Sequence, residues 1–251
     1  MKIIACYSNK GGVGKTATSV NLAHAFAESG HKTLLCDLDA QGASSFYFRL
    51  KPSKKLEGDA FFTEEKALLK SIKASDFDNL DVIPANMSFK DFDVFLSSMK
   101  KPDSQLRKAL KRVKKEYDVV VLDCPPTLSM LSQAVFECAD RVVVPVIPTT
   151  LSERTIEQLY DFFKESGLNK DAILPFFSMV QKAKKLHTET IERLSETFPA
   201  FCTTMIPFSS DVERMGVNRA PLLAYGKQTT AAMHYKHLWQ EVSASAGMPR
   251  S

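Results

Sequence analysis

The sequence predicts an α/β fold in which a mostly parallel, twisted sheet carries helices on both faces. Short apolar runs alternate along the chain with longer segments whose apolar residues recur at helical spacing, which is typical of repeated strand-helix units. Several of the apolar runs show no polar alternation, as expected for strands buried on both faces. At 251 residues the chain can pack around one core, so we expect residues 1–251 to form a single domain.

The predicted elements follow in chain order. Strands are expected at residues 2–8, 32–39, 79–85, 118–125, 141–148, 172–180 and 203–208. Helices are expected at residues 15–29, 128–138, 152–166, 186–197 and 228–243, with a shorter one near 64–73. We find no internal repeat, linker or low-complexity segment that would divide the chain.

The composition is that of a globular protein with a slightly basic balance. Hydrophobic residues make up 44% and charged residues 25%, and the formal net charge is +4, which permits an anionic partner such as nucleic acid. The amino terminus MKIIACYS is typical of a strand rather than a signal peptide, so we expect a cytoplasmic protein. The five cysteines form no C-x-x-C pair and are expected to be reduced and structural.

A glycine-rich loop, NKGGVGKTA, lies between the first predicted strand and the first predicted helix. Its glycines allow backbone N–H groups to point inward together, and the helix amino terminus adds the positive end of its dipole. The loop is therefore expected to bind an anion. It contains two lysines, Lys10 and Lys15, where one would suffice for a phosphate loop.

Two phosphate-binding motifs fit these residues. Residues 12–17 satisfy the dinucleotide motif G-x-G-x-x-A, whereas the P-loop motif G-x-x-x-x-G-K-[ST] has Asn9 in place of its first glycine. Asn is the residue that best replaces Gly at positive φ. Lys15 and Thr16 favour the P-loop, because its lysine reaches the β- and γ-phosphates and its hydroxyl binds Mg²⁺. Asp123 ends the apolar run DVVVLD, where a P-loop enzyme holds its magnesium carboxylate.

Four segments resemble the ParA/MinD family of P-loop ATPases, and most of all its short, Soj-like partition and positioning ATPases. KGGVGKT resembles the deviant Walker A motif, LLCDLDAQG the second acidic motif, and VVVLDCPP the Walker B strand. The later IPFSSDVERMGVNRAP resembles the carboxyl-terminal loop beside the nucleotide. The resemblance implies ATP and Mg²⁺ as cofactors and slow hydrolysis of ATP to ADP and phosphate.

The family resemblance also implies roles for individual residues. The expected nucleotide-binding residues are Gly11, Gly12, Val13, Gly14, Lys15, Thr16, Ala17, Pro207 and Phe208, and the expected magnesium residues are Thr16, Asp123 and Asp37. Lys15 would serve its own nucleotide, whereas Lys10 would cross to the nucleotide of the partner in an ATP-bound homodimer. Asp39 would orient the attacking water, with Asp37 supporting Mg²⁺ or the loop. Asp37 and Asp39 would share one side if the strand continued through them.

The chain departs from the family pattern at three positions. Ala17 replaces a second hydroxyl residue, Ala40 replaces the proline of the usual DPQ, and Ser178 stands where many relatives have an asparagine that reads adenine. The catalytic and magnesium residues are intact, so we expect activity to survive. Recognition of the base is less well defined by the sequence than the phosphate chemistry.

The ATP-bound form should expose a binding surface for a partner, because such ATPases act as switches. We expect sequence-independent binding of double-stranded DNA and hence a nucleoid location, with the candidate contacts Lys182, Lys184, Lys185, Arg214 and Arg219. Residues 100–115 are also rich in lysine and arginine, but their apolar stripe predicts an ordinary surface helix with a solvated outer face. A separate adaptor on the cargo would stimulate hydrolysis. Because the loop begins at residue 10, we expect no amino-terminal DNA-reading domain.

The sequence also allows alternatives to DNA binding, namely membrane binding and an enzymatic or electron-transfer role. A MinD-like membrane helix at the carboxyl end is disfavoured, because Lys236 is the one lysine or arginine in residues 228–243 and the apolar face there is expected to dock on the core. A bridging metal cluster would need paired cysteines, and the candidates Cys124 and Cys138 lie in apolar patterns. A metabolic ATP-dependent ligase on the same fold stays open. The sequence favours an ATP-dependent switch that positions a plasmid, chromosome or protein cargo.

Overall fold

The computed structural model describes residues 1–248 and contains one seven-stranded sheet in the order β3-β4-β2-β5-β1-β6-β7. The strands are β1 Lys2–Cys6, β2 Thr33–Asp37, β3 Lys73–Ala74, β4 Leu80–Ile83, β5 Val119–Asp123, β6 Arg141–Val146 and β7 Ile173–Phe177. All neighbours pair in parallel except the two-residue edge strand β3, which is antiparallel to β4. The mostly parallel sheet predicted from the sequence is confirmed.

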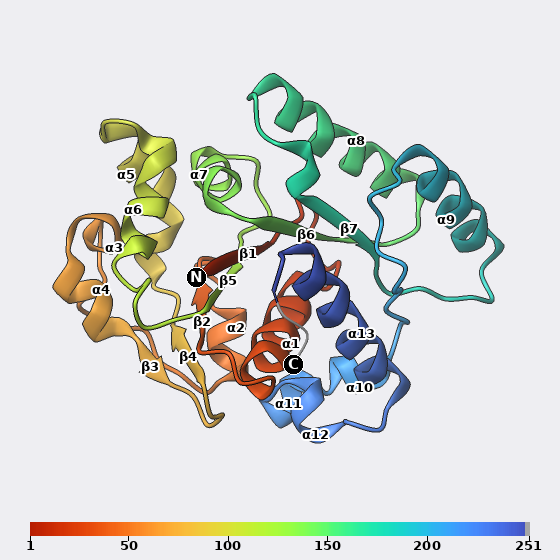
Figure 1. Cartoon of the computed structure of the whole chain (residues 1–251), viewed down its shortest axis with the longest axis horizontal. Coiled ribbons are helices and arrows are strands. Elements are labelled where there is room, and N and C mark those ends of the chain that lie inside the picture. Colours follow the sequence, from red (N-terminus) through yellow and green to blue (C-terminus); the bar gives the residue numbers. More distant parts are fainter. Residues whose placement is uncertain (249–251) are drawn as a thin grey trace.

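Helices cover both faces of this sheet (Figure 1). The longer ones are α1 Lys15–Glu28, α4 Glu65–Ser71, α5 Phe92–Ser98, α6 Gln105–Lys111, α7 Met130–Cys138, α8 Thr150–Glu165, α9 Lys185–Thr197 and α13 Thr230–Ser245. The short ones are α2 Ala43–Tyr47, α3 Ala60–Thr63, α10 Ser210–Glu213, α11 Met215–Asn218 and α12 Leu222–Tyr225, and the 3₁₀ turns are η1 Met87–Asp91, η2 Pro102–Ser104 and η3 Lys170–Ala172.

Each face of the sheet packs its own hydrophobic cluster. One cluster joins the helices from α3 through α9 to the sheet, and the other places α1, α13 and the short helices α11 and α12 on the opposite face. Every residue of β2 and β5 is buried, which explains why these strands appear in the sequence as continuous apolar runs. Since parallel strands share one carboxyl edge, the loops after β1, β2 and β5 meet there.

The predicted strand at residues 203–208 is wrong. This segment runs beside the end of β7, where the Ile206 N–H donates to the Phe177 carbonyl (2.8 Å) and the Phe208 N–H to the Val180 carbonyl (3.0 Å), but it forms only an isolated bridge at Pro207. Proline has no N–H with which to extend a ladder. The residues before it turn away instead, because the Thr203 and Thr204 N–H groups donate to the Glu241 carboxylate.

The predicted long helices are confirmed with ends shifted by a few residues, and the short helix expected near 64–73 is α4, followed by β3. The apolar stripe of the basic stretch is buried in α6 and the turn after it, at Leu106, Ala109, Leu110 and Val113, so this stretch is the surface helix that we expected. The apolar face of α13 is buried against the core as well. Within residues 1–248, none of the helices has the length and apolar character needed to span a bilayer.

Candidate nucleotide site

The glycine loop connects β1 to α1 and takes its shape from two left-handed glycines. Gly12 has φ 72° and Gly14 has φ 94°, a conformation that residues with a Cβ rarely adopt. A Cβ on Gly14 would also lie 3.0 Å from the Ser178 hydroxyl. Asn9 is not among the positive-φ residues, so our reason for accepting it in place of glycine was wrong: its backbone does not need a glycine.

The loop forms one wall of a cavity of about 330 Å³. The predicted residues that line it are Gly12, Gly14, Lys15, Thr16, Ala17, Pro207 and Phe208. The structure thus brings the amino-terminal loop and the segment after β7 together, although about 190 residues separate them in the sequence. Gly11 is exposed and Val13 is buried in the same loop; neither lines the cavity.

Sequence reasoning missed several residues that complete this cavity. Tyr47 comes from α2, Met179 from the end of the β7 segment, Glu213 from α10, and Tyr235 from α13. Ser178, at the position where relatives carry an adenine-reading asparagine, lines it too. None of these has a local motif, because each reaches the cavity through a long-range contact between elements.

Lys10 lies on the other side of the loop from this cavity. It borders a small space between the loop, β6 and α8, together with Tyr7, Val146 and Ser152, and it is not among the residues that line the 330 Å³ cavity. Its backbone N–H donates to the Ser8 hydroxyl (3.2 Å). The two lysines of the loop therefore have different surroundings: Lys15 is buried at the cavity, whereas Lys10 is half-exposed outside it.

Two buried carboxylates end neighbouring strands beside Lys15. Asp37 and Asp123 are paired in the register of β2 and β5, and each has at most 1% of its surface exposed. The hydroxyls of Ser19 and Ser44 donate to Asp123 at 3.0 and 2.6 Å. In the same way, the backbone N–H and the hydroxyl of Ser45 donate to one oxygen of Asp37, at 2.8 and 2.6 Å.

Burial and mutual repulsion disfavour the charged forms of this pair. Loss of solvation, followed by the charge of Asp123, raises the pKa of Asp37 to about 7. Loss of solvation also raises the pKa of Asp123, although the Ser44 hydroxyl and the Lys15 ammonium act in the opposite direction. The other oxygen of Asp37 has no hydrogen-bond partner among residues 1–248.

The site fits a magnesium ion bound with a nucleotide. Residues 1–248 contain no cluster of three or more His, Cys, Asp or Glu side chains able to hold a metal alone. Magnesium in P-loop sites needs no such cage, because phosphates and water supply most of its ligands. The protein then has to supply only a few oxygen ligands. The paired buried carboxylates of Asp37 and Asp123, one of them with an oxygen that has no partner among residues 1–248, lie beside Thr16 and can supply them.

Asp39 follows the end of β2, where the chain turns. Its carboxylate accepts the Gln41 N–H (2.9 Å) and its carbonyl accepts the Gly42 N–H (2.9 Å). Because β2 stops at Asp37, the strand does not carry Asp37 and Asp39 on one side: Asp37 is buried, whereas Asp39 is half-exposed. The turn leads directly into α2, whose Ser44 and Ser45 hold the buried carboxylates.

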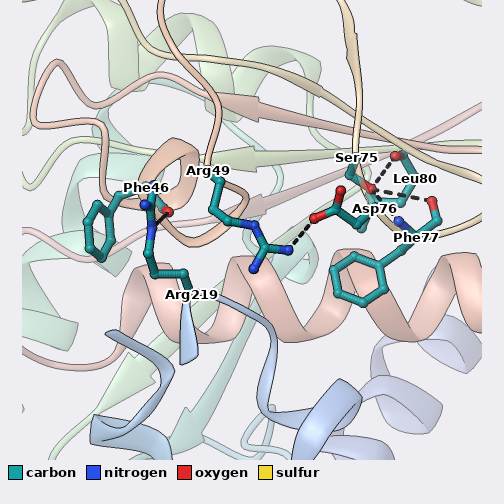
Figure 2. Close-up of polar contacts among 7 residues, drawn as sticks. All are labelled: Phe46, Arg49, Ser75, Asp76, Phe77, Leu80 and Arg219. Atoms are coloured by element: carbon teal, nitrogen blue, oxygen red, sulfur yellow. Dashed lines mark hydrogen bonds and ion pairs between the residues drawn. The ribbon is translucent and has the colours of Figure 1, made fainter. Parts of the chain in front are cut away.

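The predicted DNA residues lie in two places. Lys182 and Lys184 are exposed between β7 and α9, Lys185 is exposed as the first residue of α9, and Arg214 is exposed between α10 and α11. Arg219 differs, because its guanidinium lies 4.6 Å over the ring of Phe46 in α2 and its Nε donates to the Phe46 carbonyl (3.2 Å), as Figure 2 shows.

The five cysteines are buried and reduced, as expected: Cys6, Cys36, Cys124, Cys138 and Cys202. Burial raises the pKa of the Cys138 thiol to about 12, so it is protonated at neutral pH. These thiols therefore belong to the hydrophobic clusters rather than to the site.

Comparisons with known proteins agree with this geometry. A family model described as an AAA domain (AAA_31) matches residues 1–174. The chain is 30% identical to the sporulation initiation inhibitor protein Soj of Bacillus subtilis over 251 residues, which covers 97% of this chain and 99% of Soj.

Solved structures share the fold across the chain. An ATP complex of McdA from Cyanothece has a TM-score of 0.82 and 18% identity, covering 100% of this chain and 98% of McdA. Cobyrinic acid a,c-diamide synthase from Mycobacterium smegmatis with bound ADP and magnesium has a TM-score of 0.78 and 22% identity, covering 100% and 99%. At these identities the likeness shows the fold alone. With the family match and the Soj similarity, the chain belongs to the ParA/MinD family of P-loop ATPases.

Proposed function

We propose that this protein is a magnesium-dependent ATPase that dimerises on ATP, binds DNA without sequence preference, and positions or segregates a cargo. The observation that carries the proposal is the 330 Å³ cavity, in which the deviant P-loop faces the segment around Pro207 and Phe208. The similarity to Soj over nearly the whole chain supports the choice of a positioning ATPase. The cargo and the adaptor that stimulates hydrolysis are separate proteins in this proposal.

Within the cavity, the residues of the chain would divide the work of phosphoryl transfer. Lys15 and the loop N–H groups would hold the β- and γ-phosphates, while Thr16, Asp123 and Asp37 would hold the magnesium ion. Bound magnesium supplies charge neutralisation on the phosphates. Asp39, on the turn beside α2, would orient the attacking water.

Lys10 would act on the nucleotide of the partner subunit. Its place outside the cavity of its own subunit supports this role, because a lysine that served its own nucleotide would line that cavity as Lys15 does. Charge supplied by a second subunit stabilises the transition state only in the dimer, so hydrolysis would depend on assembly.

The DNA-binding surface would be the basic segment at the start of α9. Lys184 and Lys185 lie at the amino-terminal end of α9, where the helix dipole disfavours cations. Lys185 forms an ion pair with Glu189 one turn along the helix (3.3 Å), whereas Lys184 has no ion pair among the described residues, which supports a role of Lys184 in binding phosphates. Lys182 and Arg214 are exposed as well, whereas Arg219 is held against Phe46 and would reach DNA only by leaving that contact.

Replacing Lys15 with Ala should weaken ATP binding at least tenfold. A charge-assisted hydrogen bond contributes roughly 1.5–3 kcal/mol, which corresponds to about a tenfold or larger loss. Equilibrium titration with a fluorescent ATP analogue measures the effect, with Lys32→Ala as a control because Lys32 is exposed and outside the cavity. Equal affinities for the Lys15→Ala and Lys32→Ala variants would contradict the assignment of the loop.

The Lys10→Ala variant should bind ATP as a monomer with nearly wild-type affinity but neither dimerise nor hydrolyse it. Lys15 and the cavity are untouched, while the charge offered to the partner is gone. Sedimentation velocity with ATP, together with single-turnover hydrolysis, separates these properties. Wild-type dimerisation and turnover in this variant would show that Lys10 serves no second subunit.

The Asp39→Ala variant should accumulate as an ATP-bound dimer, because the attacking water loses its orienting carboxylate while the phosphate contacts remain. Hydrolysis is expected to fall by about 10²-fold or more, the usual contribution of a positioned acid or base. Size-exclusion chromatography with nucleotide analysis of the dimer peak tests this. A monomer with normal turnover is the result that excludes the role.

Joint reversal of charge at Lys184 and Lys185 should weaken binding of a random-sequence duplex by the ATP-bound protein. The slope of log affinity against log salt should fall by about 2, since each phosphate contact contributes about 0.9. Lys114→Glu with Lys115→Glu is the matched control, an equally exposed lysine pair on the surface after α6. Equal losses in both variants would indicate net charge rather than a site, and absence of DNA binding in every nucleotide state would favour a ligase on this fold.

A further inference from the structure

A second cavity, of about 710 Å³, lies against the nucleotide cavity and shares Pro207 with it. Three basic side chains line it: Lys182 from the loop after β7, and His234 and His237 from α13. The hydroxyl residues Thr203, Thr204 and Thr230 line it as well. We refer to this space as the histidine cavity.

The basic groups of the histidine cavity lie close together, and none of them forms an ion pair among the described residues. The rings of His234 and His237 are 6.5 Å apart between centroids. Burial, followed by the nearby His237 and Lys182, lowers the pKa of His234. Among the described residues, no Asp or Glu lines this cavity.

The other charged groups around His234 do not relieve this crowding. On α13 itself, Lys236 is exposed and adds positive charge, while Glu241 accepts hydrogen bonds from the Thr203 and Thr204 N–H groups, both at 2.8 Å. The segment at residues 203–207, which faces α13 across the cavity, contains no ionisable side chain. An anion in the cavity would therefore meet the positive charges and the Thr230 hydroxyl, whereas the Thr203 hydroxyl already donates to the Glu241 carboxylate (3.0 Å).

The amino-terminal end of α13 adds to the positive potential in the histidine cavity. This 16-residue helix begins at Thr230, so the positive end of its dipole lies at the cavity wall. Phosphate oxygens are bound at helix amino termini when cationic side chains and hydroxyls converge there. The histidine cavity has all three features.

We propose that the histidine cavity binds a phosphate group and that His234 takes up a proton when it binds. The phosphate could belong to a DNA backbone or to a free phosphorylated molecule, since both present the same tetrahedral oxygens. If the phosphate belongs to DNA, the inference rests on the proposed function and adds regulation to it, because DNA binding would depend on pH.

The direction of the pH effect follows from the charges. A bound anion stabilises protonated imidazole, so phosphate binding raises the pKa of His234 and consumes a proton. Affinity is therefore higher at pH 6 than at pH 8. One histidine that goes from neutral to charged on binding gives a change of about tenfold or more over this interval.

Sulfate is a suitable first probe, because its charge is constant between pH 6 and 8 and any pH dependence must come from the protein. Histidine ring signals followed by NMR during a sulfate titration report both binding and protonation. We expect the ring signals of His234 and His237 to shift on addition of sulfate, and the His234 signal to titrate at higher pH in its presence. The second probe is a random-sequence DNA duplex with the ATP-bound protein.

Two double variants separate charge from structure. His234→Gln with His237→Gln removes both imidazoles and should abolish the pH dependence, leaving weak binding at both pH values. His234→Lys with His237→Lys keeps the positive charge at all pH values, so binding at pH 8 should rise to the wild-type level at pH 6. His31→Gln is the control, because His31 lies outside the cavity.

The outcomes distinguish this inference from the proposed function. The inference is wrong if sulfate shifts the NMR signal of neither histidine and if DNA affinity has the same pH dependence in the wild type and the Gln double variant. DNA binding by the ATPase can still hold in that case. If DNA is not bound in any nucleotide state but sulfate binding shows the histidine pH dependence, the cavity takes a free phosphorylated molecule and the DNA proposal fails. Both proposals are supported if the Gln double variant loses DNA affinity at pH 6 and the Lys double variant binds DNA at pH 8 as tightly as the wild type does at pH 6.

Discussion

The placement of two buried carboxylates, Asp37 and Asp123, on adjacent strands determines how the rest of the nucleotide side is built. Like charges in a low-dielectric interior repel each other, and burial alone raises the pKa of both groups. The fold offsets this with hydroxyl donors on Asp123 and with Lys15 nearby, while one oxygen of Asp37 has no partner among residues 1–248. In the proposed function, a divalent cation bound at this pair would relieve the repulsion, so the arrangement would prepare the site for the cation.

The short helix α2 connects this carboxylate pair to the outside of the molecule. Its serines hold Asp37 and Asp123, its Tyr47 lines the nucleotide cavity, and its Phe46 lies under the guanidinium of Arg219 (Figure 2). The turn that contains Asp39 leads directly into it. A change of charge at the carboxylates therefore acts on a helix only five residues long, which few internal hydrogen bonds hold in place. In the proposed switch, α2 is the element best positioned to transmit the state of the nucleotide to the region around Arg219.

The sequence was informative where function is encoded locally and uninformative where it depends on contacts across the fold. The loop and the buried strands β2 and β5, which end at Asp37 and Asp123, each carry a continuous pattern, so their places could be predicted. α2 could not be predicted, because five residues are too few to show a helical period. The strand expected at residues 203–208 does not form, although its composition is apolar and β-branched, because Pro207 has no N–H with which to extend a ladder. His234 and His237 looked like ordinary positions of a surface helix until the fold placed Lys182 opposite them.

The segment around Pro207 forms a wall that the two cavities share. Because Pro207 borders both, and hydrogen bonds from Ile206 and Phe208 fix it to the end of β7, a ligand on either side presses on the same short stretch of backbone. Coupling between sites is reciprocal: if nucleotide binding shifts this segment and favours phosphate in the histidine cavity, phosphate there must favour the nucleotide by the same factor. An ATPase that releases DNA after hydrolysis would need such a link. In this fold the two cavities share a wall, so the proposed link would require no long pathway through the core.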